Sequence, residues 1–317
     1  MLKIVFFFLT ITTSVYAQIP GCTDPQAENY NAKFGKNDGS CHYKKVRLKP
    51  EHSIRLNDSL KETSGLIAFE NLLWTHNDDH DTTIYGLDSL GKIKKEIVLP
   101  AVINHDWEEI SQDDTHIYIG DFGNNYSGNR SDLKILKIEK KSFLQGSPNI
   151  ETISFSYSDQ TDFSLTKPNK TDFDCEAFIV SKDSIYLFSK QWKSSKTSIY
   201  SLSKQSGSHI AKLKSKLDTK GLVTGATYLE DKKLIALCGY TKVGKPFLYV
   251  LYDFKDQDFL SGNKRRIDLK LPFHQIEGIA TKDGLHYFLT NESLVRKPVI
   301  NVPQQIHYFD LSSVINF

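Results

Sequence analysis

Glutamate recurs at one position of a phrase that is repeated along this sequence. Among five similar segments, three have Glu at the equivalent position, namely Glu108, Glu176 and Glu277, and the other two have Ser64 and Thr224. If folding brings these segments together, their carboxylates meet. Two carboxylates about 5 Å apart repel by roughly 3 kcal/mol at an effective dielectric of about 20. A divalent cation would neutralise them most simply, and Ca²⁺ suits a set of oxygen ligands.

Each segment is followed by a turn and by a second hydrophobic run that ends in polar residues. In an antiparallel strand pair, the start of the first strand lies beside the end of the second, so these polar residues are expected at the same rim as the three Glu. The sequence thus predicts Asp121 and Glu292 as two further metal ligands. It also predicts five residues that bind a ligand at this rim: Asn77, Asp78, Lys190, Tyr240 and Asn291.

Other arrangements would relieve the same repulsion. One or two of the carboxyl groups could be protonated, or one could pair with Lys190. The acidic residues could also accept hydrogen bonds from backbone N–H groups of the neighbouring repeat, in which case they would only lock the repeats together. The sequence leaves these alternatives open beside metal binding.

The repeated segments also predict the fold. From 44 to 317, short runs rich in Ile, Val, Tyr, Phe and Leu alternate with clusters of Gly, Asn, Asp and Ser, without the apolar spacing of an amphipathic helix. The equivalent positions recur about every 40 to 50 residues, as in the four-stranded blades of a β-propeller. We therefore predict an all-β fold, a β-propeller of four-stranded blades, with five blades favoured over six. One longer interval contains 159–173, interpreted as a loop insertion, with a degenerate extra blade as the alternative.

The two ends of the repeated region differ from its middle. The last repeat ends after its third strand, at Phe309, whereas a strand-forming stretch at 44–56 precedes the first repeat. A strand from 44–56 that pairs beside the C-terminal strand would complete the last blade and remove a free sheet edge. We expect the ring to close in this way.

The N-terminus has the features of a signal peptide. It contains one Lys, an apolar run from Ile4 to Leu9, and small residues ahead of a cleavage site after Ala17. The apolar run is too short for a membrane anchor, and no later segment has about 18 uninterrupted apolar residues. The protein is therefore expected to be exported, to the periplasm or the cell exterior, without a transmembrane anchor. Lipidation of Cys22 is the alternative, because 19–22 partly fits a lipoprotein cleavage site.

Two cysteines, Cys22 and Cys41, bracket a segment rich in Asn, Asp and Gly. An exported chain meets an oxidising compartment, so a disulfide between them is expected. Closing a loop of about 20 residues contributes roughly 3 kcal/mol on the chain-entropy model, which can hold a segment with few apolar side chains. Four side chains of the segment could bind calcium or, as the alternative, only stabilise turns: Asp24, Asn31, Asn37 and Asp38.

Composition limits the class of partner. The 40 Lys and Arg residues nearly balance the 38 Asp and Glu residues, which leaves a formal net charge of +2. Nucleic-acid binding usually needs a much larger basic excess, so nucleic acid is not expected as a partner. The sequence divides into a signal peptide at 1–17, a disulfide-bracketed module at 18–43 and a β-propeller at 44–317.

Several segments resemble known protein families. The pattern GCTDPxAxNY in 21–43 resembles a short module of secreted bacterial proteins, and SGLIAF, DWEEI, DFGNN, DCEAF and IEGI resemble a family of secreted bacterial β-propellers. The SGL phrase, followed by a Trp-containing strand and IYGLD, is more distantly similar to gluconolactonase, lactonase and phytase-like propellers. The resemblance implies a channel-bound Ca²⁺ with Glu108, Glu176 and Glu277 as ligands. Lactonase sites use one Glu with Asn and Asp, whereas three repeats offer Glu here, so no activity is carried over.

Two functions follow from these observations. The sequence favours an exported binding or interaction protein whose carboxylate-lined, calcium-binding channel mouth engages a small molecule, a glycan or a protein. The alternative is a calcium-dependent hydrolase of a lactone, an ester or a phosphoester, in which the metal polarises the bond and activates water. The binding function is favoured because the sequence shows no nucleophile elbow, zinc-binding pair or acid–base dyad.

Overall fold

The computed structural model describes residues 19–315, so the predicted signal peptide lies outside the described residues. The described strands form antiparallel meanders of four strands each, as the repeats predict. The first two comprise β5 (Thr63–Phe69), β6 (Leu72–Asn77), β7 (Thr83–Leu87) and β8 (Ile93–Val98), then β9 (Trp107–Gln112), β10 (His116–Asp121), β11 (Lys134–Glu139) and β12 (Ile150–Tyr157).

The remaining meanders follow in chain order. The third and fourth comprise β13 (Asp174–Val180), β14 (Ser184–Lys190), β15 (Thr197–Ser203) and β16 (Gly207–Leu217), then β17 (Leu222–Leu229), β18 (Leu234–Tyr240), β19 (Pro246–Tyr252) and β20 (Asn263–Leu269). The fifth comprises β21 (Ile276–Thr281), β22 (His286–Asn291), β25 (Gln305–Asp310) and β4 (His52–Arg55). Smaller elements are β1 (Pro20–Gly21), β2 (Lys36–Asn37), β3 (Val46–Leu48), a 3₁₀ turn (Asp58–Leu60), α1 (Lys140–Leu144), β23 (Leu294–Arg296) and β24 (Ile300–Val302).

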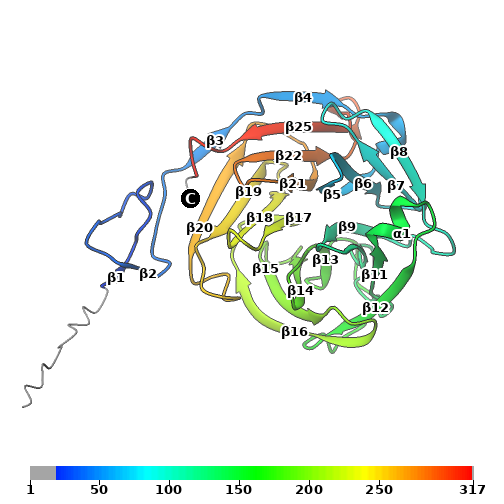
Figure 1. The fold of residues 1–317 in the computed structure, drawn as a ribbon, viewed down its shortest axis with the longest axis horizontal. Coiled ribbons are helices and arrows are strands. Elements are labelled where there is room, and N and C mark those ends of the chain that lie inside the picture. The colour runs from blue at the N-terminus through cyan, green and yellow to red at the C-terminus, as the bar shows by residue number, and fades with distance from the viewer. Residues whose placement is uncertain (1–18, 316–317) are drawn as a thin grey trace, which may run out of the picture.

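The first strand of each meander lies on the inside of a ring (Figure 1). Each of these inner strands contacts the next, from β5 through β9, β13 and β17 to β21, and β21 contacts β5 again. The protein is therefore an all-β propeller, as predicted. Because β12 and β16 also pair with each other in parallel, two meanders share one continuous sheet. The sheets thus do not correspond one to one with blades, and the preference for five blades over six stays a prediction.

Apolar side chains fill the spaces between neighbouring meanders. One buried cluster joins Trp74 of the first meander to Trp107 of the second, and another joins Leu73 of the first to Ile306 of the last. A single meander leaves apolar side chains on both faces, so each needs a neighbour on either side. Closing the ring gives every meander two such neighbours.

The N-terminal strand β4 closes the ring, as predicted for 44–56. It pairs antiparallel with β25, so that the last meander takes its outer strand from the beginning of the described chain. Leu56, which follows β4, is buried, and its backbone N–H donates a hydrogen bond to the Gln304 carbonyl oxygen at 3.1 Å. The pairing covers the edge of β25 and makes β4 the outer strand of this meander.

The insertion at 159–173 contains no strand, in agreement with its interpretation as a loop. It lies against the loop that follows β10. The backbone N–H of Thr166 donates to the Ser127 carbonyl oxygen, and that of Asn169 donates to the Asn125 carbonyl oxygen, each at 2.8 Å. Two long loops thus support each other at one end of the ring.

The predicted disulfide joins Cys22 and Cys41, whose Cα atoms are 4.7 Å apart. Because this bond occupies the Cys22 sulfur, the alternative of lipidation at that sulfur is wrong for this structure. The module also contacts the propeller through the buried carboxylate of Asp24, whose Oδ2 accepts hydrogen bonds from the Tyr43 hydroxyl at 2.8 Å and the Tyr252 hydroxyl at 2.5 Å.

The polar side chains of the module stabilise turns rather than gather around a cation. In each of four cases, a side-chain oxygen accepts a hydrogen bond from the backbone N–H two residues later, as in an Asx turn. This holds for Asp24, Asn31, Asn37 and Asp38. The structure therefore favours the turn interpretation over a calcium site in the module.

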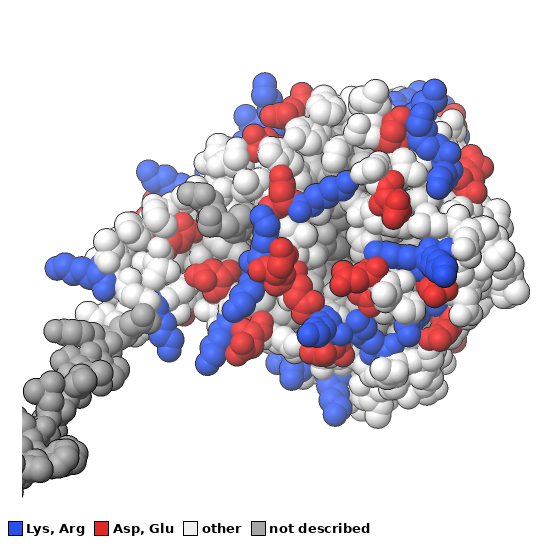
Figure 2. All heavy atoms as spheres, in the orientation of Figure 1, with Lys and Arg blue, Asp and Glu red and all other residues white. Residues whose placement is uncertain are grey.

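Two further features of the described residues concern their helices and the charges on one face. None of the helices in the described part of the chain is long and apolar enough to cross a membrane. On the face shown in Figure 2, acidic and basic side chains are interspersed instead of being separated by sign. A binding surface for phosphate backbones usually gathers basic residues on one face or along one helix.

Candidate functional site

An extra residue interrupts the inner strand at an equivalent position in several meanders. In β9, the residues on either side of Glu108 pair with consecutive residues of β10, so Glu108 has no partner in the ladder. The same β-bulge leaves Glu176 unpaired in β13, Thr224 in β17 and Glu277 in β21. A bulge re-aims the extra side chain. This explains how carboxylates from three strands can point out of their sheets and line one shared space.

That space is a cavity of about 220 Å³, which we call the acidic cavity. Its lining has two basic side chains, Lys190 and Arg296. Seven residues predicted from the sequence line it: Glu108, Glu176, Glu277, Glu292, Asp78, Lys190 and Tyr240. With Asp106, which the prediction left out, the lining contains six carboxyl groups: Asp78, Asp106, Glu108, Glu176, Glu277 and Glu292.

One group of carboxyls belongs to β9 and β13. Glu108, Asp174 and Glu176 offer oxygens that all lie within 4.8 Å of one another. Lys190, at the end of β14, forms an ion pair with Glu176, and the two side chains are only 4% and 2% exposed. Burial, followed by the charges of Glu176 and Asp106, raises the pKa of Glu108 well above its usual range. The pairing with Lys190 is one of the alternatives that the sequence left open, and it compensates a single carboxylate.

Lys190 is the buried cation of the acidic cavity. Its ammonium lies 4.9 Å from the centroid of the Trp192 ring and 5.4 Å from that of Tyr240. Burial alone would lower the pKa of Lys190, but the negative charge of Glu176 and of its acidic neighbours raises this pKa well above the usual value. The ammonium therefore stays charged at neutral pH, and it leaves most of the carboxyl groups without a counter-ion.

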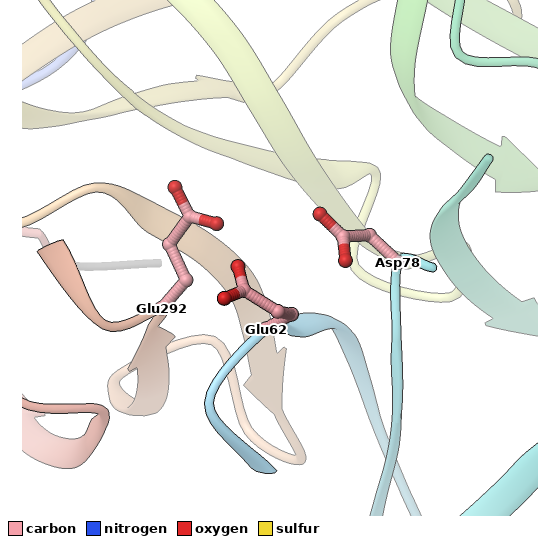
Figure 3. A group of neighbouring side chains, drawn as sticks. All are labelled: Glu62, Asp78 and Glu292. Carbon is pink, nitrogen blue, oxygen red and sulfur yellow. The ribbon is translucent and has the colours of Figure 1, made fainter. Parts of the chain in front are cut away.

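A second group, Glu62, Asp78 and Glu292, gathers where β5 begins and where β6 and β22 end (Figure 3). Their oxygens also lie within 4.8 Å of one another. Burial, with the charges of Glu62 and Asp79, raises the pKa of Asp78 to about 8. Burial and the charge of Glu277 raise the pKa of Glu292 well above its usual range. Without a cation, the Asp78 carboxyl group therefore retains a proton at neutral pH.

The charge of Glu277 affects pKa values in both groups of carboxyls. Its charge contributes to the raised pKa of Glu176 and to that of Asp78. The side chain is only 6% exposed, and within the described part of the chain its Oε2 atom is buried without a hydrogen-bond partner. Burial raises the pKa of Glu277 to about 7, although the charge of Lys190 lowers it. A buried oxygen without a partner is costly, so this atom points to a ligand that would complete it.

Gly123 allows two carboxylates to approach the backbone. A Cβ atom at position 123 would overlap Oδ2 of Asp106 and Oε1 of Glu108. The Gly123 backbone N–H also donates to the Asp106 carbonyl oxygen at 3.2 Å. The glycine in DFGNN thus has a steric role in the acidic cavity, which the repeat pattern alone did not indicate.

Asp121 does not line the acidic cavity. Its carboxylate is fully buried, 2.9 Å from Nη2 of Arg130 and 3.3 Å from Nζ of Lys134. Two cations of the protein already compensate its charge. The sequence placed it at the rim because it ends β10, but the structure turns its side chain toward the loop that follows this strand.

Asn77 and Asn291 are also held outside the lining. The Asn77 amide donates to the Ser59 carbonyl oxygen at 2.8 Å and to Oδ2 of Asp81 at 2.9 Å. The Asn291 amide donates to the Glu292 carbonyl oxygen at 2.7 Å, and its Oδ1 pairs with Nε2 of His307 at 2.7 Å. Both residues support the ends of their strands, and their adjacent residues, Asp78 and Glu292, reach the cavity.

Several residues of the site lie outside the predicted set. Asp106 and Asp174 stand two positions before Glu108 and Glu176, and side chains two apart in a strand share a face, so this spacing could have indicated them. Asn124 and Trp192 donate hydrogen bonds to Asp174, each at 2.7 Å, which fixes its carboxylate. Loop residues gave no repeat signal: Asn125, Asn169, Trp192, Gln275 and Arg296.

The two repeats without Glu use a hydroxyl group to lock neighbouring meanders. Ser64 Oγ donates to the backbone oxygen of Glu108, and Thr224 Oγ1 donates to that of Ile276. Structural locking is therefore present at these positions. In the other three repeats, the equivalent side chain is a carboxylate that lines the acidic cavity.

Glu109 lies beside the repeat position and was not predicted as a site residue. Its side chain is fully buried, and Oε2 accepts a hydrogen bond from the backbone N–H of Ala226 at 2.6 Å, which links β9 to β17 inside the ring. Burial raises its pKa well above the usual range, although hydrogen bonds from backbone N–H groups lower it. Glu109 connects strands that are not neighbours in the ring, so its role is structural.

Comparisons with known proteins add little to this geometry. No family model matches the chain, and no curated protein matches it. A streptogramin B lyase structure is similar over 82% of this chain and 87% of its own, with 13% identity and a TM-score of 0.42. A galactose complex of an exo-β-1,3-galactanase from Phanerochaete chrysosporium is similar over 83% and 65%, with 11% identity and a TM-score of 0.48. The propeller assignment rests on the strand pairing, and membership of the secreted bacterial family stays a prediction.

Proposed function

We propose that the protein is an exported binding protein that holds a divalent cation, Ca²⁺, in the acidic cavity of its propeller. The observation that carries this proposal is the buried Oε2 atom of Glu277, which has no hydrogen-bond partner among the described residues while five other carboxyl groups line the same space. The disulfide of the module supports export, because such bonds persist in oxidising compartments.

The donor set fits a hard cation. The side chains that line the acidic cavity offer carboxylate, amide and hydroxyl oxygens, and neither His nor Cys is among them. Oxygen-only sites favour Ca²⁺, Mg²⁺ or Mn²⁺ over Zn²⁺ or copper, and a larger set of flexible carboxylates favours Ca²⁺. Asp78 and Glu292, whose oxygens lie within 4.8 Å of each other, would hold the ion with Glu277, while Glu176 stays paired with Lys190. A bound ion would compensate their negative charge and offer a positive site to a ligand at the channel mouth.

Replacing Glu277 is expected to weaken calcium binding. The change Glu277→Gln keeps the shape of the side chain and an oxygen acceptor for Tyr240, whose hydrogen bond lowers the pKa of Glu277. It removes one negative charge from the site, so we expect the Kd for Ca²⁺ to rise about tenfold or more, measured by calorimetry on chelator-treated protein.

Asp38→Asn is the matched control for this change. Asp38 lies in an Asx turn of the module, and Asn preserves the acceptor of that turn. The control should bind Ca²⁺ like the unchanged protein. Loss of binding in the control but not in Glu277→Gln would move the cation site to the module and contradict the proposal.

Calcium affinity is expected to rise between pH 6 and pH 8. The folded protein raises the pKa of Asp78 to about 8 and that of Glu277 to about 7, mainly through burial. Protons therefore occupy these carboxyl groups at pH 6 and must leave when a cation binds. The calcium-free protein, conversely, loses stability as the pH rises through this window, because its folded state binds more protons than its unfolded state. We expect the Kd for Ca²⁺ at pH 8 to be about tenfold smaller than at pH 6.

The hydrolase alternative has one observation in its favour. Burial raises the pKa of Asp106 to about 6, near the range in which a carboxyl group can exchange protons during catalysis. Calcium-dependent cleavage of a lactone or an ester, lost in Glu277→Gln while the fold persists, would support the hydrolase and replace simple binding as the function. Calcium binding without cleavage supports the binding protein.

A further inference from the structure

A second cavity adjoins the acidic cavity, and its chemistry is different. Its volume is about 600 Å³, within the range of small-molecule sites, and we call it the vestibule. The two cavities share part of their lining: Asn169, Trp192, Tyr240, Gln275 and Arg296. A molecule in the vestibule would therefore lie directly beside the carboxyl groups and any cation that they hold.

The vestibule is lined by basic residues without acidic ones. Lys170, Lys242 and Arg296 contribute to its wall, and no Asp or Glu does. Among the described residues, none of the three takes part in an ion pair. The change from six carboxyl groups in one cavity to three basic residues in the next indicates an anionic ligand for the vestibule.

The vestibule also presents apolar surface to solvent. Phe273 is 45% exposed and Val243 is 67% exposed, and Trp192 contributes a half-buried indole ring. Phe273 adopts a φ of 64°, a left-handed conformation that is costly for a bulky residue. Its backbone N–H donates to the Gly244 carbonyl oxygen at 2.8 Å, which helps to hold this conformation. This conformation places the Phe273 ring in the wall of the vestibule.

We propose that the vestibule binds an organic carboxylate with a flat apolar body. The body lies against Phe273 and Trp192, and the carboxylate faces Arg296 at the junction of the two cavities. A guanidinium group matches a carboxylate because it can donate two parallel hydrogen bonds. The proposal rests on the proposed function in one respect, since a Ca²⁺ ion in the acidic cavity would add to the attraction for the carboxylate.

Fluorescence of Trp192 can report this binding. Trp74 and Trp107 are fully buried, whereas Trp192 lines the vestibule, so a nitroaromatic ligand should quench Trp192 selectively. We expect 4-nitrobenzoate to quench the fluorescence saturably, with a Kd at least tenfold smaller than that of the neutral 4-nitrobenzyl alcohol. Arg296→Gln should abolish this preference for the acid. Phe273→Ala should raise the Kd of both ligands about tenfold. The variant Phe163→Ala, at another exposed Phe, should change neither Kd.

The same titration separates the two proposals when it is run with chelator and with Ca²⁺. Calcium binding without saturable quenching by 4-nitrobenzoate would overturn the vestibule proposal and leave the cation site intact. Equal binding of acid and alcohol would overturn the assignment to a carboxylate. A third outcome is quenching that depends on Arg296 and Phe273 while calorimetry detects no Ca²⁺ binding. This outcome would support the vestibule proposal and overturn the cation site.

Discussion

A chain that begins at residue 57 should lose about 10 °C or more in Tm relative to one that begins at residue 44. The shorter chain lacks β3 and β4, and with them the pairing of β3 to β20, the pairing of β4 to β25 and the buried side chain of Leu56. Burying a Leu or Ile side chain contributes about 1.5 to 3 kcal/mol, so the loss of Leu56 and the packed Ile54 amounts to about 4 kcal/mol. For a chain of this size, each kcal/mol corresponds to roughly 2 to 4 °C in Tm.

The chain that begins at residue 44 is the control, since it lacks the module but keeps β3 and β4. Thermal unfolding of both chains, followed by circular dichroism, measures the difference. The shorter chain should also associate in a concentration-dependent way, because β25 becomes an open edge. A synthetic peptide covering 44–56 should restore part of the lost Tm. Equal Tm values for the two chains would show that β3 and β4 do not stabilise the ring.

Replacing the buried lysine should destabilise the calcium-free protein severely. In Lys190→Met, Glu176 loses its only ion-pair partner among the described residues while it remains buried. Breaking a buried pair by removing one member costs about 3 to 5 kcal/mol. The raised pKa of Glu176 lets this carboxyl group take up a proton, so the cost should be largest at high pH. Urea unfolding at pH 8 in the presence of a chelator measures it.

Calcium should recover much of this loss, because a cation in the acidic cavity can replace the ammonium as counter-charge. The double variant Lys190→Met with Glu176→Gln is the matched control. It removes both charges of the ion pair, and its stability should lie within about 1 kcal/mol of the unchanged protein. If Lys190→Met alone unfolds at the same urea concentration as the unchanged protein in chelator, the ion pair contributes nothing to the fold.

The repeats predicted most of the scaffold. The fold class, the strands of the repeats, the closing strand at 44–56 and the Cys22–Cys41 bond all follow from patterns in the sequence: alternation, turn residues, and two cysteines that bracket a polar segment. The repeat phrase also located Glu108, Glu176 and Glu277 at one cavity, because equivalent positions of a ring of similar units face one axis. The metal role of these residues stays a prediction.

The sequence could not show which side chain of each strand end turns inward. Asp78 and Asn77 are adjacent, yet only Asp78 lines the acidic cavity, because Asn77 is held by Ser59 and Asp81. Asp121 was expected at the rim, but Arg130, far along a following loop, draws its carboxylate away. Such choices depend on long-range partners that no local pattern specifies.

The residues of the channel mouth that the sequence did not predict lie in segments that connect the repeated strands. Arg296 belongs to the short hairpin of β23 and β24, and Phe273 lies in the turn between β20 and β21. Neither segment repeats along the chain, so the comparison of units gives no information on them. The vestibule forms where these segments meet.

The β-bulges of the inner strands have a consequence for how this protein could change over time. The bulged residue takes no part in the ladder, so exchanging Glu for Thr there, as already happens between Glu277 and Thr224, leaves the neighbouring pairs in place. Each of the four inner strands β9, β13, β17 and β21 thus offers one position at which the side chain can be exchanged. Mutation or laboratory design can alter what the mouth selects one blade at a time, without rebuilding the ring that carries it.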